Sequence, residues 1–250
     1  MMNPAEFANI AEVERDFWWY RGMRVILNRL LDPLLAGRKV QTVLEAGCGT
    51  GYNALEFERC HRWRVVPLDL QMEGLAYGRS LGLDRLVQGD AAALPFRSGT
   101  FDLAFSLDVI VHFPRGMENA PVAELARVLA SAGLLVLRVS ALDSLRSRHS
   151  QFTGERQRFT RRRLIELVRR HGIRVLRCTY ANTALLPLAV AKFRVWEPLT
   201  RQAPQSGIRP VSPWLNRILA LPLAGESQWL GAGFNFPVGQ SLILIGEKAE

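Results

Sequence analysis

The stretch VLEAGCGTGYN, residues 43–53, decides how this sequence folds. An apolar run typical of a β-strand ends at Glu45, and glycines then alternate with other residues before a helical pattern begins. Glycine permits positive φ and a close approach of ligand to backbone, and amide groups near a helix N-terminus point toward such a ligand. Tyr52 stands where the dinucleotide pattern G-x-G-x-x-G needs its third glycine, so the stretch predicts a nucleotide-type site but not an NAD site. The alternating glycines are Gly47, Gly49 and Gly51.

Outward from this stretch, short apolar runs alternate with amphipathic segments over residues 40–139. Strands separated by helical stretches of about ten residues are typical of right-handed βαβ crossovers in a parallel sheet. After a polar loop, one more helix and strand are expected, followed later by a strongly apolar final strand. The expected strands are 40–46, 63–68, 85–88, 101–107, 134–139, 174–180 and 241–246, and the expected helices are 52–60, 72–81, 121–129 and 161–171.

One large domain, or one domain with an inserted cap, is favoured over two independent cores at a length of 250 residues. The segment rich in proline and tryptophan before the final strand lacks strand alternation, so it predicts a helical insertion over one edge of the sheet. The predicted division is an N-terminal helical lid or opening segment at 1–38, the sheet core at 39–182, the helical cap at 183–239 and the final strand at 240–250.

The composition is that of an ordinary globular protein, with 48% hydrophobic and 22% charged residues and a formal net charge of +9. The three cysteines are scattered, and neither a Cys-x-x-Cys pair nor a His/Cys cluster occurs, so no disulfide framework and no metal site are expected. The chain start does not match a signal peptide, and the apolar stretches are shorter than the about 20 residues that a membrane span needs. A cytoplasmic location without a membrane span is therefore expected.

The positive charge alone does not identify a partner. Residues 156–177 hold the densest basic block, and their helical pattern gathers the apolar positions on one face while the arginines fall mostly on the others. A solvated helix face is the favoured interpretation, with nucleic-acid or anionic-substrate binding as the alternatives.

Two further carboxylates follow the next two predicted strands. Asp69 ends the second strand, where its oxygens can accept hydrogen bonds from the two hydroxyls of a ribose, although a helix cap is the alternative. Asp90 follows the third strand, where it can accept from an exocyclic adenine amine while the N–H of Ala91 donates to a ring nitrogen. Because the carboxyl ends of parallel strands share one edge, Glu45, Asp69 and Asp90 are predicted to line one crevice.

These residues resemble the class I S-adenosylmethionine-dependent methyltransferases, and most closely the small-molecule branch sometimes called type 11. The resemblance implies an α/β fold: a Rossmann-like, seven-stranded, mostly parallel sheet with helices on both faces, an antiparallel last strand and a helical cap. Its usual Pro-Gly-Gly before the fifth strand is Ser131-Ala132-Gly133 here, and Val111 replaces a glutamate that the subgroup often has. The segments that carry the resemblance are 17–27, 43–53, Asp69, 89–96, 101–113, 124–137, 158–173 and 236–248.

The resemblance also implies the cofactor S-adenosyl-L-methionine, with S-adenosyl-L-homocysteine as the product. The region of Glu45 and the glycines would meet its methionyl part, Asp69 its ribose, and Asp90 its adenine. The aromatic run FWWY at 17–20 either packs its helix onto the body or forms a lid, with Tyr20 and Arg21 as the lid residues. The predicted cofactor-binding residues are Glu45, Gly47, Gly49, Gly51, Asp69, Leu70, Asp90, Ala91, Leu107, Tyr20 and Arg21.

The implied reaction moves a methyl group to a small-molecule acceptor, with O-methylation favoured and C- or N-methylation open. His112 is the candidate base, because an imidazole with an ordinary pKa of ~6.5 suits proton removal, although it can equally hydrogen-bond its loop. Asp108 is expected either to orient a ligand or to cap its loop, and His149 is a weaker candidate near the acceptor.

Aromatic residues of the predicted cap can form the wall of an acceptor pocket, so a partly apolar acceptor is expected, in secondary-metabolite, lipid or quinone-like biosynthesis. Nucleic-acid methylation is the first alternative, disfavoured because the sequence lacks an Asn/Asp-Pro-Pro-aromatic segment. The second is a protein of this fold that binds the cofactor without methylating, such as a cyclase.

Overall fold

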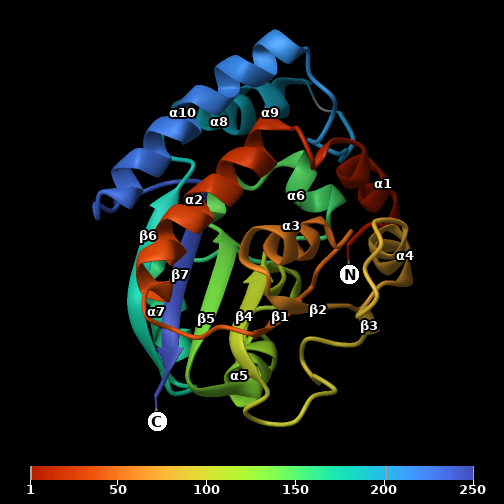
Figure 1. The fold of residues 1–250 in the computed structure, drawn as a ribbon. Coiled ribbons are helices and arrows are strands. Elements are labelled where there is room, and N and C mark those ends of the chain that lie inside the picture. The colour runs from red at the N-terminus through yellow and green to blue at the C-terminus, as the bar shows by residue number, and fades with distance from the viewer. Residues whose placement is uncertain (1, 201, 250) are drawn as a thin grey trace.

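A computed structural model describes residues 2–200 and 202–249 of the chain (Figure 1). One sheet holds seven strands in the order β3-β2-β1-β4-β5-β7-β6. Neighbours from β3 to β5 pair in parallel, whereas β7 runs antiparallel to both β5 and β6. The predicted α/β class, with its antiparallel last strand, is therefore confirmed. The strands are β1 (Thr42–Ala46), β2 (Arg64–Asp69), β3 (Val87–Gln88), β4 (Phe101–Leu107), β5 (Leu129–Ser140), β6 (Ile173–Ala181) and β7 (Ser241–Lys248).

Helices cover both faces of this sheet (Figure 1). The α-helices are α1 (Pro4–Val13), α2 (Trp18–Leu35), α3 (Tyr52–His61), α4 (Met72–Ser80), α5 (Asn119–Val128), α6 (Arg148–Phe152), α7 (Arg161–Arg169), α8 (Leu186–Val190), α9 (Glu197–Thr200) and α10 (Pro213–Gly231). Two 3₁₀ turns, η1 (Ile110–His112) and η2 (Asp143–Leu145), and a π-helical stretch, η3 (Ala191–Trp196), complete the described elements.

Two core layers follow from the alternation of side chains along the buried strands. In β1, Val43 and Leu44 are both fully buried but point to opposite faces of the sheet. Leu44 packs in the layer that holds α5 and α7, and Val43 packs in the layer that holds α2, α3 and α10. An unbroken apolar strand therefore has helices on both of its sides, as the sequence pattern predicts.

Strand β5 is longer than expected, since it begins at Leu129 rather than near residue 134. Leu129 already pairs with Phe101, and the register then shifts before Leu103 pairs with Leu134. Ala132 lies within this irregularity with φ at 58°, a left-handed conformation that costs a residue with a Cβ about 1–2 kcal/mol. The chain thus makes this left-handed turn with an alanine instead of a glycine.

The segment between β6 and β7 is helical and packs on α2. A Cβ on Gly22 would lie 2.3 Å from Cδ1 of Leu223, so α2 and α10 are in close contact at this glycine. Near the end of α10, Arg177 of β6 donates to the carbonyl of Leu230 at 2.7 Å, which ties the segment to the edge strand. The exact extents 1–38 and 183–239 remain predictions. In the described residues, the helices lack the length and hydrophobicity that crossing a bilayer requires.

Candidate functional site

A cavity of about 780 Å³ opens at the carboxyl ends of β1, β2 and β4. Its walls come from α1, the start of α2, the loops after these strands, α6 and the segment from η3 to Ile208. Pockets for small ligands and cofactors have volumes of about 300–1,000 Å³, so this cavity can hold a nucleotide-sized molecule. Of the predicted cofactor residues, Glu45, Gly47, Gly49, Asp69, Leu70, Asp90, Ala91, Leu107 and Tyr20 line it.

The glycine loop after β1 is held against β2. The N–H groups of Gly47 and Cys48 both donate to the carbonyl of Leu68, at 2.7 and 2.9 Å. Gly47 has φ at 81°, and a Cβ there would lie 2.1 Å from Cγ2 of Val109, so only glycine fits. The loop is therefore conformationally fixed, and it borders the cavity with Cys48 and Thr50 as well as with Gly47 and Gly49.

Asp69 fixes the same loop while facing the cavity. Its Oδ2 accepts from the N–H of Gly49 at 2.8 Å, and its Oδ1 accepts from the N–H of Gln71 at 2.9 Å. Burial raises the pKa of Asp69, and these amide donors act in the opposite direction. Each carboxylate oxygen retains acceptor capacity, so the structural role of Asp69 leaves room for a ligand hydroxyl.

Glu45 is the most unusual group in the cavity. Its side chain is 1% exposed, and its Oε2 has no hydrogen-bond partner among the described residues. Burial, together with the nearby charge of Glu14, raises the pKa of Glu45 to about 8, and a hydrogen bond to Asn53 acts in the opposite direction. An isolated buried carboxylate is costly, so a cationic ligand group placed beside this oxygen would be strongly favoured.

Helix α1 forms a wall that the sequence did not predict. Both carboxylate oxygens of Glu14, just after α1, lie within 2.7 Å of the hydroxyl of Thr50 in the glycine loop. A Cβ on Gly74 would lie 2.6 Å from the ring of Phe7, so α1 also contacts α4 closely. The signal in the sequence was the Asn3-Pro4 helix start, which predicts a helix but not where it docks.

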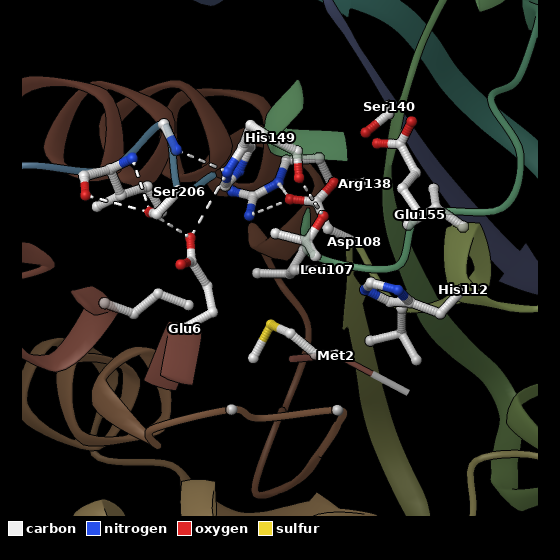
Figure 2. A pocket seen from close by; sticks show the side chains of 18 of the residues that line it. Met2, Glu6, Leu107, Asp108, His112, Arg138, Ser140, His149, Glu155 and Ser206 are labelled. Atoms are coloured by element: carbon white, nitrogen blue, oxygen red, sulfur yellow. Dashed lines mark hydrogen bonds and ion pairs between the residues drawn. The ribbon is translucent and has the colours of Figure 1, made fainter. Parts of the chain in front are cut away.

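The cavity also holds paired charges (Figure 2). Arg138 of β5 makes an ion pair with Asp108 at 2.7 Å, and its guanidinium lies 5.0 Å from the centre of the Trp19 ring. Arg158 and Glu155 form a second, nearly buried pair at 2.6 Å. Asp108 is therefore held by Arg138, and its backbone is left-handed with φ at 60°. It can still either cap its loop or orient a ligand, as the sequence suggested.

The two histidines of the cavity differ in which ring nitrogen carries the proton (Figure 2). Nδ1 of His112 lies 3.3 Å from the carbonyl of Gly154, so Nδ1 carries the proton and Nε2 keeps a lone pair. In His149, Nδ1 instead accepts from the N–H of Gly207 at 3.0 Å, which puts the proton of the neutral ring on Nε2. Burial lowers the pKa of both rings, so His112 is a neutral base at pH 7, whereas neutral His149 presents only a donor.

Two predicted cofactor residues do not line the cavity. Arg21 is exposed on α2, because the helix turns it away from the face that carries Tyr20. Gly51, with φ at 80°, starts α3 and allows close packing, since a Cβ there would lie 2.7 Å from Leu83 and 3.2 Å from Cα of Gly78. Close packing around the start of α3, rather than contact with a ligand, therefore explains why position 51 is a glycine.

The described residues contain no group of three or more His, Cys, Asp or Glu side chains placed to hold a metal ion. Asp90 lines the cavity and its Oδ1 accepts from the N–H of Ala92 at 2.8 Å. The three carboxylates of Glu45, Asp69 and Asp90 thus face one cavity, as their positions after successive strands predict.

Comparison with known proteins places this geometry in a family. Residues 44–137 match the family described as "Methyltransferase domain". Over 130 residues the chain is 35% identical to a malonyl-[acyl-carrier protein] O-methyltransferase of Enterobacter lignolyticus, covering 50% of this chain and 51% of that protein. The chain thus spans about half the length of the curated relatives it matches.

Solved structures share the fold over more of the chain. A complex between the Haloferax volcanii Trm112 methyltransferase activator and a methyltransferase contains a chain with a TM-score of 0.60 at 20% identity, with 98% of both chains covered. The [4+2]-cyclase SpnF has a TM-score of 0.56 at 19% identity, over 89% of this chain and 80% of its own. Residues 44–137 therefore match the methyltransferase family, and the seven-stranded fold of the described chain is the one that these solved structures share.

Proposed function

We propose that this protein binds S-adenosylmethionine in the cavity and transfers its methyl group to a small-molecule acceptor. The observation that carries the proposal is the buried, unpartnered Oε2 of Glu45 beside the glycine loop, where Gly47 has no room for a side chain of its own. S-adenosylmethionine carries two cationic groups, a sulfonium and an α-ammonium, and a buried carboxylate without a partner suits such a ligand. The cofactor would supply an electrophilic methyl group that needs no metal or redox partner.

Different residues of the chain would bind different parts of the cofactor. Glu45 would balance the positive methionyl end, with the glycine loop against it. Asp69, at the end of β2, would accept from the ribose hydroxyls while its bond to Gly49 keeps the loop in place. Asp90, after β3, and the adjacent Ala91 would contact the adenine. Helix α1, anchored through Glu14 and Thr50, would exclude water from this end.

His112 is the group that we propose as the base on the acceptor side. Its hydrogen bond to Gly154 leaves Nε2 free to accept a proton, and burial keeps the ring neutral at pH 7. A positioned base contributes typically 10²–10⁴-fold to a rate, which matters for a hydroxyl acceptor with a high pKa. His149 is not proposed as a base, since Gly207 occupies its Nδ1 lone pair.

The acceptor end of the cavity favours a molecule that is partly apolar. Phe193 and Trp196 line it together with the polar pairs around Arg138 and Arg158. A malonyl-[acyl-carrier protein] O-methyltransferase is among the relatives, which supports transfer to oxygen, and others of them are named as demethylmenaquinone and sterol methyltransferases. We therefore propose an acceptor with an apolar body and a methylated oxygen, within lipid-like or quinone-like biosynthesis.

A second candidate function has one specific observation in its favour. The fold of the [4+2]-cyclase SpnF covers most of this chain, so the same architecture serves a reaction named as a cyclisation. Under this alternative the chain would bind the cofactor and not consume it. Nucleic-acid methylation keeps only the net charge of +9 as support.

Calorimetric titration with S-adenosylhomocysteine tests cofactor binding. Micromolar affinity is expected for the native chain, with loss of binding in Asp69→Ala and no change in Asp84→Ala, which removes an exposed aspartate. Absence of binding to the native chain refutes the proposal. A mass-spectrometric screen of acceptors with a labelled methyl donor then separates methyl transfer from the cyclase alternative, for which tight binding without any labelled product is the expected result.

A further inference from the structure

The segment from residue 183 to 239 carries most of the exposed apolar side chains of the molecule. Of the 16 large hydrophobic residues that are exposed in the described chain, 11 lie in these 57 residues. Single exposed hydrophobic residues are ordinary, but a concentration on one segment marks a surface that contacts something apolar. We call the following set the cap surface, each member being more than half exposed: Leu188, Val195, Trp196, Leu199, Trp214, Ile218, Leu221 and Phe234.

Helix α10 has two apolar faces, of which only one is covered. Leu223 and Leu230 are fully buried in the core layer that contains α2. Trp214, Ile218 and Leu221 follow one another at i, i+4 and i+7, so they share one stripe, and they are 63%, 52% and 68% exposed. Packing within the described chain therefore explains one face of α10 and leaves this stripe uncovered.

The exposed charged side chains among the described residues of 183–239 are all positive. Lys192, Arg194, Arg209 and Arg217 are all exposed. The two carboxylates of the same segment are engaged with the body of the protein: Glu197 accepts from the N–H of Arg148 at 2.8 Å, and the buried Glu226 accepts from the N–H groups of Thr183 and Ala184 at 2.7 Å. A second copy of the chain on this surface would oppose like charges, so the surface fits an anionic partner with an apolar interior.

We propose that the cap surface binds the surface of an anionic lipid bilayer, with α10 lying in the plane of the membrane. Tryptophan beside apolar residues, with arginine and lysine at the edge, is the composition of helices that lie at the level of the lipid headgroups. In the view of Figure 1, the helices α8, α9 and α10 occupy the end of the molecule beyond the carboxyl ends of the parallel strands.

The cap surface is also continuous with the cavity. Trp196 is 64% exposed and at the same time lines the cavity, and its neighbours Lys192 and Phe193 line it as well. A membrane bound at the cap surface would thus lie against the cavity mouth. Binding to the bilayer does not depend on methyl transfer. The further idea that the bilayer supplies an amphiphilic acceptor to the cavity rests on the function proposed above.

Vesicle co-sedimentation of the full chain tests the proposal, using phosphatidylcholine vesicles with and without one quarter of phosphatidylglycerol. Each basic residue near an anionic surface contributes about fivefold to the partition coefficient. Arg194→Glu with Arg217→Glu should therefore lower binding at least about tenfold. The matched control, Arg64→Glu with Arg79→Glu, makes the same change in net charge at exposed sites outside the cap and should bind like the native chain.

A second pair of variants tests the apolar contribution. Trp214→Ser with Leu221→Ser should abolish sedimentation with the vesicles, while Leu81→Ser, which removes an exposed leucine after α4, should not. Binding of S-adenosylhomocysteine is measured for every variant, so that a folding defect, or failure of the proposed cofactor site, is recognised separately from loss of membrane binding.

Three outcomes would overturn the proposal. In the first, the native chain does not sediment with the phosphatidylglycerol vesicles. In the second, the control charge variant loses as much binding as the cap charge variant. In the third, Trp214→Ser with Leu221→Ser dissociates a dimer without affecting vesicle binding, which would assign the surface to a second copy of the chain. Sedimentation that depends on phosphatidylglycerol and on both cap variants, but on neither control, supports it.

Discussion

Replacing Glu45 by glutamine should abolish a proton release that accompanies ligand binding. A carboxyl group with a pKa of about 8 is about nine-tenths protonated at pH 7. A cationic ligand group beside the unpartnered Oε2 favours the ionised form, so binding should expel that proton. S-adenosylhomocysteine, which carries an α-ammonium group, should therefore release up to about 0.9 proton at pH 7 and about 0.1 at pH 9.

The assay is calorimetric titration at each pH in buffers with different ionisation enthalpies, because the released proton is taken up by the buffer. Glu45→Gln keeps the shape of the side chain but cannot titrate, so its binding enthalpy should no longer depend on the buffer. Glu12→Gln, an exposed site on α1, is the control and should release as many protons as the native chain. Equal release in Glu45→Gln and the native chain, or none in the native chain at pH 7, would refute the reasoning.

The same carboxyl group should shape the stability of the free protein. Its pKa is raised on folding from 4.5 to about 8, so the native state binds more protons than the unfolded state across that window. Stability contributed by the neutral form is thus present below pH 4.5 and is lost as the pH rises to 8, by up to about 5 kcal/mol at 1.36 kcal/mol per pKa unit. Urea unfolding of Glu45→Gln should lack this contribution.

Three other substitutions have defined outcomes. His112→Gln should lower kcat by about 10²–10⁴-fold without changing the Kd of S-adenosylhomocysteine, and a changed Kd would contradict a role as base. Because burial lowers the pKa of His112, the acid limb of the native pH–rate profile should lie below pH 6.5. Ala132→Gly should raise the free energy of unfolding in urea by about 1 kcal/mol, because it relieves a positive φ; unchanged stability would count against strain there. Gly22→Ala should lower the melting temperature, since its Cβ would lie 2.3 Å from Leu223, and Leu223→Ala should partly restore it.

The sequence was sufficient for the parts of the fold that rest on local periodicity. The strand Phe101–Leu107 and the start of helix Tyr52–His61 are where the apolar pattern and the glycine loop put them. The meeting of Glu45, Asp69 and Asp90 in one cavity also follows, because parallel strands in sequential crossovers end at one edge. Their convergence needed only topology, not the positions of individual side chains.

The remainder of the site depends on contacts between distant segments. Whether His149 can act as a base is decided by the N–H of Gly207, 58 residues away, and the sequence contains no signal for that bond. Likewise, the pairing of Glu14 with Thr50 depends on how α1 docks, and the outward turn of Arg21 depends on the helical phase of α2. Residue type indicated which groups were reactive, whereas tertiary hydrogen bonds determined which of them could react.

The distribution of charge inside the cavity explains how a chain of net charge +9 can hold a cationic ligand. Asp108 and Glu155 each form an ion pair with an arginine at 2.7 Å or less, so these two pairs carry little net charge. At the glycine loop, the hydrogen-bond partners of the carboxylates of Asp69 and Glu14 are neutral amides and a hydroxyl, and one oxygen of Glu45 has none. The carboxyl groups without an arginine hydrogen-bond partner are therefore gathered beside the glycine loop. When Glu45 ionises, its charge in this low-dielectric cavity acts on a ligand more strongly than the surface arginines do through water. In the free protein this arrangement raises the pKa of Glu45, and a bound cation would lower that pKa again.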